Sequence, residues 1–410
     1  MSQIDELIAQ YCPNGVEFKE LKDIFKISRG RVMSKEYLSQ NKGEYPVYSS
    51  QTANNGQIGK ISTYDYDGEY LTWTTDGANA GTIFYRNEKF SITNVCGLLK
   101  ANSFEILPKF AYYVLCMTMK SFVSSGMGNP KLMSNIVAKI QIPLPPLPVQ
   151  QEIVNILDKF TELEAELEAE LEARRKQYEY YRNRLLSATE VNGKWLMNGV
   201  EVEWKTMGEI GKFIRGNGLQ KKDFTESGVG CIHYGQIYTY YGIFTSETKS
   251  FVSEVTARKL QKVQKNDLII TNTSENIEDV CKTVVWLGEN EIVTGGHATI
   301  FKHKENPKYL AYYTQTPMFF AEKKKLAKGT KVIDVSAKDL AKIQIPIPPL
   351  SEQERIVEIL DKFDSLVNDI SIGLPAEIDG RRIQYEYYRG KLLDFKPVVN
   401  DKRLVINEIS

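Results

Sequence analysis

Motifs for catalysis and for metal binding are missing from this 410-residue sequence. It has three histidines, and its five cysteines are scattered, with no CxxC pair and no histidine at a spacing that would complete a zinc site. Neither a GxxxxGK(S/T) phosphate loop nor an HExxH helix occurs. These absences favour a binding or scaffolding protein over an enzyme, with no catalytic or metal-ligating residue, and they predict reduced, mostly buried thiols.

Long apolar segments are missing too. The N-terminus carries acidic residues and no apolar run of signal-peptide length, and no stretch approaches the roughly 20 apolar residues that span a bilayer. We therefore expect a cytoplasmic protein with no membrane partner. With 42% apolar residues, the chain is long enough to bury the cores of two or three domains.

An internal repeat dominates the sequence. Residues 139–160 read KIQIPLPPLPVQQEIVNILDKF, and residues 342–363 read KIQIPIPPLSEQERIVEILDKF. Each copy ends in a second matching segment, RRKQYEYYRNRLL at residues 174–186 and RRIQYEYYRGKLL at residues 381–393. A repeat of this length indicates two matching halves. The segments between the repeats are therefore expected to be two similar domains.

Charge is balanced over the chain but unevenly distributed. There are 52 basic and 52 acidic residues, yet residues 19–139 include 15 basic and 10 acidic residues, and residues 204–342 include 21 and 15. The rest of the chain is correspondingly acidic. Such segregation is expected when two basic domains contact a polyanion and the connecting elements serve another partner. Chance variation of surface charge is the alternative interpretation.

Both segments between the repeats combine short strands with one late helix. Runs rich in Tyr, Thr, Ile and Val are bounded by Gly and Asn turns, which is typical of strands. The expected strands are residues 21–30, 45–50, 69–75 and 81–85, and then 207–216, 267–272 and 282–286. The expected late helices are residues 110–123 and 309–326, followed by loops at 126–130 and 328–336. We predict two mixed α/β domains with β-rich cores.

Each repeat begins with a proline joint and continues as a helix. The prolines between Pro143 and Pro148 remove backbone donors and favour extended geometry, so they predict a stiff exit from the first domain. A helix is expected from about Gln150, with a coiled-coil stripe that includes Tyr178 and Tyr181, and its mate should start near Glu352. The predicted fold class is thus α/β (α+β), with the two domains joined by two long helices in an antiparallel coiled coil and related by a pseudo-two-fold internal repeat.

The two helices differ in the middle. The first contains Leu-Glu-Ala-Glu tetrads from Leu163, which have high helix propensity. The second has Gly373, Leu374, Pro375 and Gly380 there, with four more residues, and is expected to be broken or kinked. Helix length would then act as a ruler, since one tetrad changes it by about 6 Å.

Together these features resemble the specificity subunit of type I DNA restriction-modification systems. The resemblance rests on the PLPPL and PIPPL joints, the two helix starts, the Leu-Glu-Ala-Glu tetrads and the repeated RRxQYEYYR ends, and it spans essentially the whole chain. The chain departs from the family pattern at residues 148–151 of the first joint and in its interrupted second helix.

The resemblance implies a non-catalytic subunit in which each target-recognition domain reads one half of a split site in double-stranded DNA. It implies that the helices set the spacer and dock two methyltransferase (M) subunits, and that restriction/translocase (R) subunits join the complex. S-adenosylmethionine, ATP and Mg would be cofactors of those partners, and none is expected in this chain. The implied division is 1–142 and 196–345 for the recognition domains, 143–195 and 346–395 for the joints and spacer helices, and 396–410 for the tail.

Polar turn residues beside the expected strands are the candidate DNA contacts. Reading base edges needs Arg or Lys for guanine and Asn or Gln for adenine, while other Lys and Tyr side chains hold phosphates. The candidates in the first domain are Arg29, Arg31, Ser49, Ser50, Gln51, Thr74 and Lys131. The candidates in the second domain are Arg215, Asn217, Lys221, Tyr234, Gln236, Tyr240, Asn272 and Lys331. Each is also compatible with a solvated surface residue or a turn former.

The repeated helix ends supply the candidate partner contacts, because aromatic and arginine residues concentrate in interface cores. These candidates are Tyr180, Arg182, Tyr387 and Arg389. Tyr178 and Tyr181 lie on the heptad stripe and are expected to pack between the helices instead. Two alternative functions stay open: a coiled-coil scaffold without sequence-specific DNA binding, and the recognition subunit of a methyltransferase that lacks a motor or nuclease partner. Copurification with a methyltransferase alone would favour the second.

Overall fold

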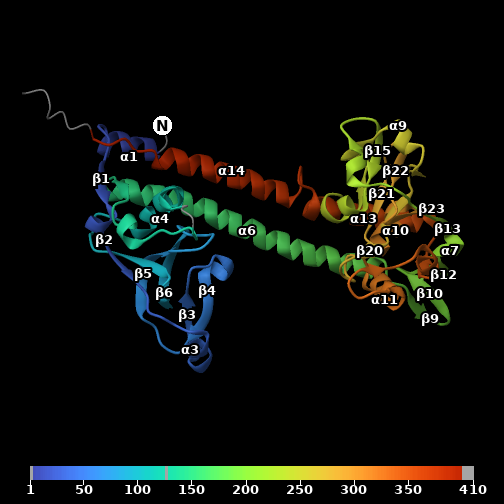
Figure 1. Ribbon diagram of the computed structural model, residues 1–410, viewed down its shortest axis with the longest axis horizontal. Coiled ribbons are helices and arrows are strands. Elements are labelled where there is room, and N and C mark those ends of the chain that lie inside the picture. The colour runs from blue at the N-terminus through green and yellow to red at the C-terminus, as the bar shows by residue number, and fades with distance from the viewer. Residues whose placement is uncertain (1–2, 125–127, 399–410) are drawn as a thin grey trace, which may run out of the picture. The chain divides into compact units, whose positions relative to one another are not determined.

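The computed structural model describes residues 3–124 and 128–398 (Figure 1). Contacts group the chain into two compact units: unit 1 comprises Met1–Glu166 and Asp379–Ser410, and unit 2 comprises Leu167–Ile378. Each unit therefore contains one of the domains between the repeats and parts of both repeats. Two residues of the expected loop at 126–130, and residues 399–410 of the tail, lie outside the described residues.

Unit 1 is built on a six-stranded sheet with the strand order β2-β7-β5-β6-β3-β4. The strands are β2 (Phe25–Arg29), β3 (Lys42–Tyr48), β4 (Gln57–Ile61), β5 (Tyr66–Thr74), β6 (Ile83–Ile92) and β7 (Cys96–Ala101). All neighbours are antiparallel except β3 and β6. Helix α4 (Pro108–Thr118) packs on this sheet, and its Phe110 and Tyr113 share a buried core with Leu71 and Trp73. The other helices here are α1 (Gln3–Tyr11), α2 (Leu21–Ile24), α3 (Lys35–Gln40), η1 (Ala53–Gly56), η2 (Met119–Phe122) and α5 (Ser134–Val137).

Unit 2 contains two five-stranded sheets, ordered β13-β23-β19-β21-β16 and β14-β17-β15-β22-β18. The first is formed by β13 (Gly211–Arg215), β16 (Phe244–Thr245), β19 (Leu268–Thr271), β21 (Thr283–Trp286) and β23 (Ala298–His303). The second is formed by β14 (Phe224–Thr225), β15 (Val229–Ile232), β17 (Ser250–Val252), β18 (Gln261–Val263) and β22 (Ile292–Thr294). The prediction of two mixed α/β domains with β-rich cores is confirmed.

Shorter elements complete unit 2. The strands are β9 (Thr189–Val191), β10 (Lys194–Met197) and β11 (Val200–Glu201) in one small sheet, and β20 (Thr273–Ser274) with β24 (Ile333–Asp334) in another. The short helices are α7 (Met207–Ile210), η3 (Lys221–Asp223), α8 (Tyr234–Thr239), α9 (Glu254–Ala257) and α12 (Ala337–Leu340).

The proline joints are strands in both units. β1 (Glu17–Glu20) pairs antiparallel with β8 (Gln141–Leu144), and β12 (Glu203–Thr206) pairs antiparallel with β25 (Gln344–Ile347). Phe18 lies opposite Pro143 in the first pair, and Trp204 lies opposite Pro346 in the second. Proline lacks an N–H and is tolerated in such two-stranded edges. The repeated sequence thus builds the same exit from both domains.

Long helices follow the joints. α6 (Leu147–Leu185) follows β8, and α13 (Leu350–Asn368) follows β25. Both helices begin two or three residues before the predicted starts at Gln150 and Glu352. In α6 the reason is that Pro148 lies in the first turn, where the missing N–H of proline removes no helical hydrogen bond. The predicted break is confirmed, because α13 ends at Asn368 and α14 (Leu374–Leu393) begins after it. Within the described residues, no helix is both long and apolar enough to cross a membrane.

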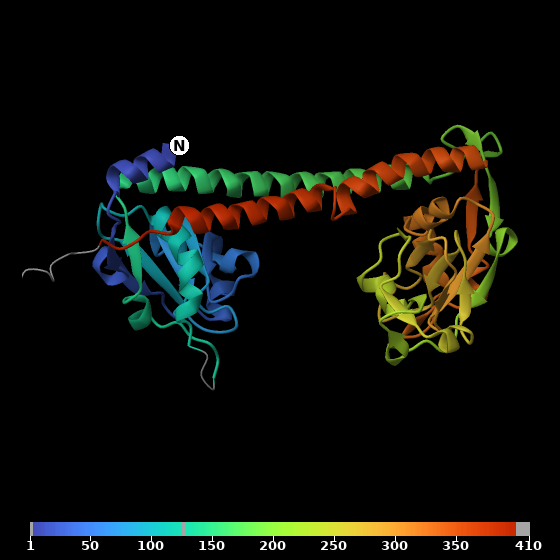
Figure 2. The ribbon, with the colours of Figure 1, turned by 90° about the horizontal axis from the view of Figure 1, so that it is seen from above.

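In unit 1, α6 and α14 lie side by side and antiparallel (Figures 1 and 2). Phe160 of α6 stacks on Tyr388 of α14 with ring centroids 5.5 Å apart. Glu164, one turn further along α6, pairs with Arg382, one to two turns earlier in α14, at 2.5 Å. The predicted antiparallel contact is therefore present.

In unit 2, α6 packs in the same way on α13. Phe363 of α13 stacks on Tyr181 of α6 with ring centroids 5.4 Å apart, and it also stacks on Tyr178, which is 6% exposed. Because Phe363 is the repeat equivalent of Phe160, each unit joins the start of one repeat to the end of the other. Tyr178 and Tyr181 pack between helices, as predicted.

A buried glutamine ties each helix start to the late helix of its own unit. The amide nitrogen of Gln150 donates to the carbonyl oxygens of Pro145 and Glu105 at 2.7 Å, and its oxygen accepts the Leu107 N–H at 2.8 Å. In unit 2, Gln353 donates to the Pro348 carbonyl and accepts the Asn306 N–H, both at 2.9 Å. Both glutamines are 0% exposed.

A lysine-carboxylate pair adds a second link at the same place. Lys109 of α4 binds Asp158 of α6 at 2.7 Å, and Lys308 of α10 (Pro307–Tyr313) binds Asp361 of α13 at 2.7 Å. Each carboxylate also accepts a tyrosine hydroxyl from the same late helix. These contacts hold the late helix of each domain on the long helix that leaves it.

Three local predictions were wrong. The single helix expected at residues 309–326 is two helices, α10 and α11 (Pro317–Leu326), because Thr316 caps a new N-terminus by accepting the Phe319 N–H and Pro317 starts the new helix. The strands expected at 21–30 and 207–216 each open with one helical turn, α2 or α7. In α7 the turn is stabilised by a capping box between Thr206 and Glu209.

Candidate nucleic-acid interface

Adjoining loops in unit 1 bring most of its predicted DNA contacts together. The Thr93 hydroxyl donates to Ser49 at 2.8 Å, and Thr93 also forms a backbone bridge with Arg31. Ser50 Oγ accepts the Thr75 N–H at 3.0 Å. The loops that follow β2, β3, β5 and β6 therefore meet in one place.

Three cationic side chains lie around these loops. Lys131 is exposed and its backbone pairs with that of Asp76, in the loop after β5. Arg29 donates to Ser134 Oγ at 3.2 Å. Arg31 is exposed and pairs with Asp65 at 3.0 Å. The hydrogen bond from Arg31 to Tyr37, followed by its bond to Asp65, raises the pKa of Arg31. The set is a basic rim with polar turns between the cations.

The matching loops of unit 2 also converge. Arg215 at the end of β13 donates to the Gly296 carbonyl at 3.3 Å, and the Gly216 N–H donates to the Ala298 carbonyl at 2.9 Å. His297 lies 3.1 Å from the Thr273 hydroxyl and packs on Tyr234 with ring centroids 4.8 Å apart. Lys331 is exposed in the loop before β24, which pairs with β20.

A pocket of about 420 Å³ opens among these loops, and we call it the histidine pocket. Its lining residues come from two loops and the start of α8: Gly218, Leu219, Gln220, Lys221, His233, Tyr234, Gly296 and His297. His233 Nδ1 accepts the Gly235 N–H at 3.1 Å. Burial lowers the pKa of His233, and the nearby cation Lys221 and His297 lower it further.

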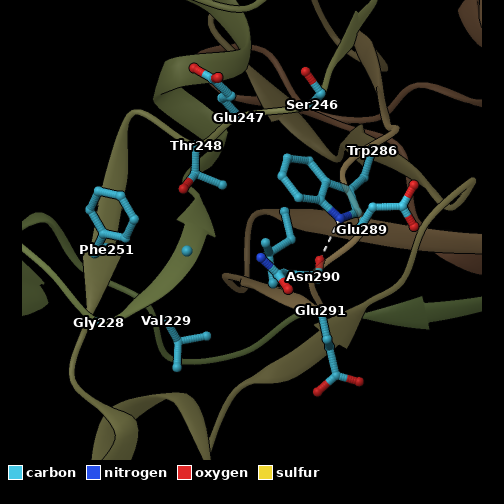
Figure 3. A pocket seen from close by; sticks show the side chains of 12 residues that line it. Gly228, Val229, Ser246, Glu247, Thr248, Phe251, Trp286, Glu289, Asn290 and Glu291 are labelled. Carbon is cyan, nitrogen blue, oxygen red and sulfur yellow. Dashed lines mark hydrogen bonds between the residues drawn. The ribbon is translucent and has the colours of Figure 1, made fainter.

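A second pocket lies at the other end of strands β15 and β22, and glutamates line it. Strands β15 and β22 are parallel, so both begin at one end and finish at the other. The histidine pocket follows their carboxyl ends, whereas a pocket of about 490 Å³ lies at their amino ends (Figure 3). Glu247, Glu289 and Glu291 line this acidic pocket, and Trp286 in its wall donates to the Asn290 carbonyl at 2.8 Å. Glu289 pairs with Lys265, and Glu291 pairs with Lys262 at 3.5 Å, so lysines balance part of the negative charge at this end.

Two predicted DNA contacts are excluded by burial. Thr74 is 0% exposed, and its hydroxyl is used inside the loop, where it donates to the Asn79 carbonyl and accepts the Thr82 N–H. Asn272 is 1% exposed, and it donates to the Val335 carbonyl and accepts from Thr299. These predictions were wrong, because a polar residue type does not reveal whether its side chain is turned into the fold.

Other predicted contacts differ in how free their side chains are. Gln51 donates to the Gln57 carbonyl at 2.7 Å, and Gln236 donates to Ser250 at 2.7 Å, so both side chains hold loop structure. Asn217 is exposed and donates to the Lys259 carbonyl at 2.8 Å. Tyr240 lies apart from the histidine pocket, in a pocket that also contains Lys282. His233 and His297 were not among the predicted contacts, although their place beside glycine-rich turns was a usable signal.

The predicted partner contacts divide by exposure. Tyr180 is 56% exposed and Tyr387 is 63% exposed. Arg182 and Arg389 are half-buried and lie over the rings of Tyr178 and Tyr385, at 5.5 and 4.9 Å from the ring centroids. The tyrosines offer surface to a partner, while the arginines belong to the packing of the helices.

In the part of the chain that the structure describes, no group of three or more His, Cys, Asp or Glu side chains is arranged to hold a metal ion. The five cysteines are unpaired, and all but Cys116 are buried. Burial raises the pKa of the Cys96, Cys231 and Cys281 thiols to about 12.

Comparisons with known proteins agree with this architecture. The family model for the type I restriction modification DNA specificity domain matches residues 13–173 and again residues 199–379. A Mycoplasma pneumoniae protein named as a type I specificity subunit is 32% identical over 383 residues, covering 93% of this chain and 98% of that protein. The specificity subunit of a type I restriction enzyme from the same organism is 43% identical over 172 residues, covering 41% of this chain and 52% of that protein.

Solved structures show the same fold. The crystal structure of a type I restriction-modification S subunit from M. genitalium has a TM-score of 0.56 and 17% sequence identity, and the match covers 93% of this chain and 97% of that one. The two regions matched by the family model each contain one domain, its proline joint and the helix start that follows. The chain therefore belongs to the type I restriction-modification DNA specificity family.

Proposed function

We propose that this chain is the non-catalytic DNA-reading subunit of a type I restriction-modification complex, and that each unit reads one half of a split site in double-stranded DNA. One observation carries the proposal: in both units, loops that follow several different strands meet, and predicted cationic side chains lie on these loops. Such a set can hold phosphates at its rim and read base edges between them.

Exposure suggests how the work is divided among the residues. Exposed cations at loop tips are suited to phosphate contacts, and the half-buried polar side chains are suited to shaping the reading loops. The proposed contacts or loop supports in unit 1 are Arg29, Arg31, Ser49, Ser50, Gln51 and Lys131. Those in unit 2 are Arg215, Asn217, Lys221, Tyr234, Gln236, Tyr240 and Lys331.

We propose further that two M subunits dock at the helix ends, through the exposed rings of Tyr180 and Tyr387. Restriction/translocase subunits would join through that complex. Methyl transfer from S-adenosylmethionine and ATP-driven steps that need Mg would then take place on the partners, in the cytoplasm, where the DNA is. The helices would set the number of unread base pairs between the half-sites.

Domain exchange tests the proposal. Residues 19–139 are replaced by the corresponding segment of another such subunit, and DNA methylated by the complex is mapped. One half-site should change and the other should stay, because each half-site is assigned to one unit. The matched control replaces residues 204–342 and should change the other half-site. Retention of both original half-sites after either exchange would contradict modular reading.

A further inference from the structure

The histidine pocket presents hydrogen-bond donors to its interior. Since His233 Nδ1 accepts the Gly235 N–H, the ring proton lies on Nε2, which becomes a donor. The amine of Lys221 is a donor in every state. Throughout residues 3–124 and 128–398, neither Lys221 Nζ, His233 Nε2 nor the Tyr234 hydroxyl has a hydrogen-bond partner. Three unused groups that can donate therefore line one hollow.

Ring contacts in the pocket hold the side chains of His233 and Tyr234 in place. His233 is 6% exposed, and its ring lies 4.4 Å from that of Tyr234, which in turn lies 4.8 Å from His297. His297 is held from its other side by Thr273. Aromatic contacts and a capping hydrogen bond thus fix the direction of the His233 ring. A donor held in one direction selects among base edges more sharply than a mobile one.

Guanine is the base whose edge matches this set. In the major groove guanine shows two neighbouring acceptors, N7 and O6, whereas adenine pairs an acceptor with a donor, cytosine shows a donor, and thymine shows one acceptor beside a methyl group. We propose that the histidine pocket is a guanine-reading site, in which Lys221 and His233 donate to N7 and O6 of a guanine in the half-site read by unit 2. This inference rests on the proposed function.

A phosphate oxygen also accepts hydrogen bonds, so it is the competing occupant. Three features favour a base edge. Lys221 is the only formal cation in the pocket lining, the His233 ring is neutral because its Nδ1 accepts the Gly235 N–H, and the donors lie in a hollow between loops. Binding to phosphates depends mainly on charge, and its strength rises with the number of Lys and Arg side chains that neutralise them. A contact to phosphate would also carry no sequence information.

Two variants separate the donors from the fold. His233→Asn keeps a residue that caps helix N-termini well, so α8 should form as before, but removes the Nε2 donor. Lys221→Met removes an exposed amine and leaves the fold unchanged. The control is Glu289→Gln in the acidic pocket, at the far end of the same strands. Unchanged thermal unfolding of each variant confirms that the comparison is between folded proteins.

The test uses the complex with its methyltransferase and duplexes that carry the mapped motif. Guanines of the half-site assigned to unit 2 are replaced one at a time by 7-deazaguanine, which has carbon in place of the N7 acceptor. For the unaltered chain and for Glu289→Gln, affinity should fall about tenfold at one position. Both variants should bind the normal duplex more weakly. The variant that lacks the donor to N7 should lose little more with 7-deazaguanine at that position, whereas the variant that lacks the donor to O6 should still lose affinity there.

Three results would overturn the guanine site: a half-site without any G·C pair, full tolerance of every 7-deazaguanine by the unaltered chain, or a loss in both variants that is equal for all sequences. The last result would identify a phosphate contact instead. Failure of the proposed function looks different, because the unaltered complex would then show no sequence preference at all.

Discussion

Replacing Gln150 by methionine tests how the joint holds unit 1 together. Methionine has a similar length, so the change removes hydrogen bonds without opening a large cavity. The change leaves the Pro145 carbonyl, whose hydrogen bond to Gln150 is buried, without a donor. It also removes the partly buried hydrogen bonds to the Glu105 carbonyl and from the Leu107 N–H. An unsatisfied buried group costs about 1–3 kcal/mol, and a typical lost hydrogen bond costs about 1 kcal/mol.

Together these losses amount to about 3 kcal/mol in the free energy of unfolding of unit 1, which corresponds to roughly 6–12 °C in its unfolding temperature. Calorimetry gives the temperature, and hydrogen exchange of peptides from α4 shows whether the loss lies where the contacts are. The matched control is Gln151→Met, because Gln151 is exposed and bonds only to Asn155 of its own helix. It should change stability by less than about 0.5 kcal/mol. Equal unfolding temperatures for the two variants would refute the reasoning.

Other predictions concern partners, pH and the spacer. Tyr180→Ala with Tyr387→Ala should weaken copurification of the methyltransferase without lowering the unfolding temperature, because both rings are exposed; unchanged copurification would contradict their docking role. Burial lowers the pKa of His303 in the folded protein below the value of about 6.5 for an unfolded chain. Below pH 6.5 the unfolded chain therefore binds more protons than the folded one, and unit 2 should lose stability as pH falls through that value. His303→Phe should reduce the decline measured by thermal unfolding between pH 8 and 5.5; an equal decline would exclude this histidine as a cause. Inserting one Leu-Glu-Ala-Glu tetrad after Glu170 should lengthen α6 by about 6 Å and widen the unread gap by about two base pairs, with both half-sites kept. An unchanged gap in methylation mapping would contradict the ruler.

Features that depend on local sequence were predictable. The proline joints, the long helices and the break before Leu374 follow from residue types that act on their own backbone. The packing of Tyr178 and Tyr181 followed from the heptad stripe. The boundary errors have local causes as well, since Pro317 was taken as part of a helix interior although proline is suited to a first turn.

Features that depend on contacts between distant residues were not predictable from residue type. Thr74 and Asn272 have the chemistry of DNA contacts, but their hydrogen-bond partners inside the fold turn them inward. The role of Gln150 depends on residues more than 40 positions away. One signal was available, because Gln150 and Gln353 occupy the same place in the two repeats while neighbouring residues differ.

The central claim is that this chain gives a methyltransferase a split DNA sequence to read. Genomic DNA should be mapped for methylated bases in cells that express the chain with its neighbouring methyltransferase, and compared with DNA from cells that lack the chain. The account predicts a new motif of two short half-sites separated by a fixed, unspecified gap. Absence of any new methylation, with both proteins shown to be expressed and associated, would contradict it.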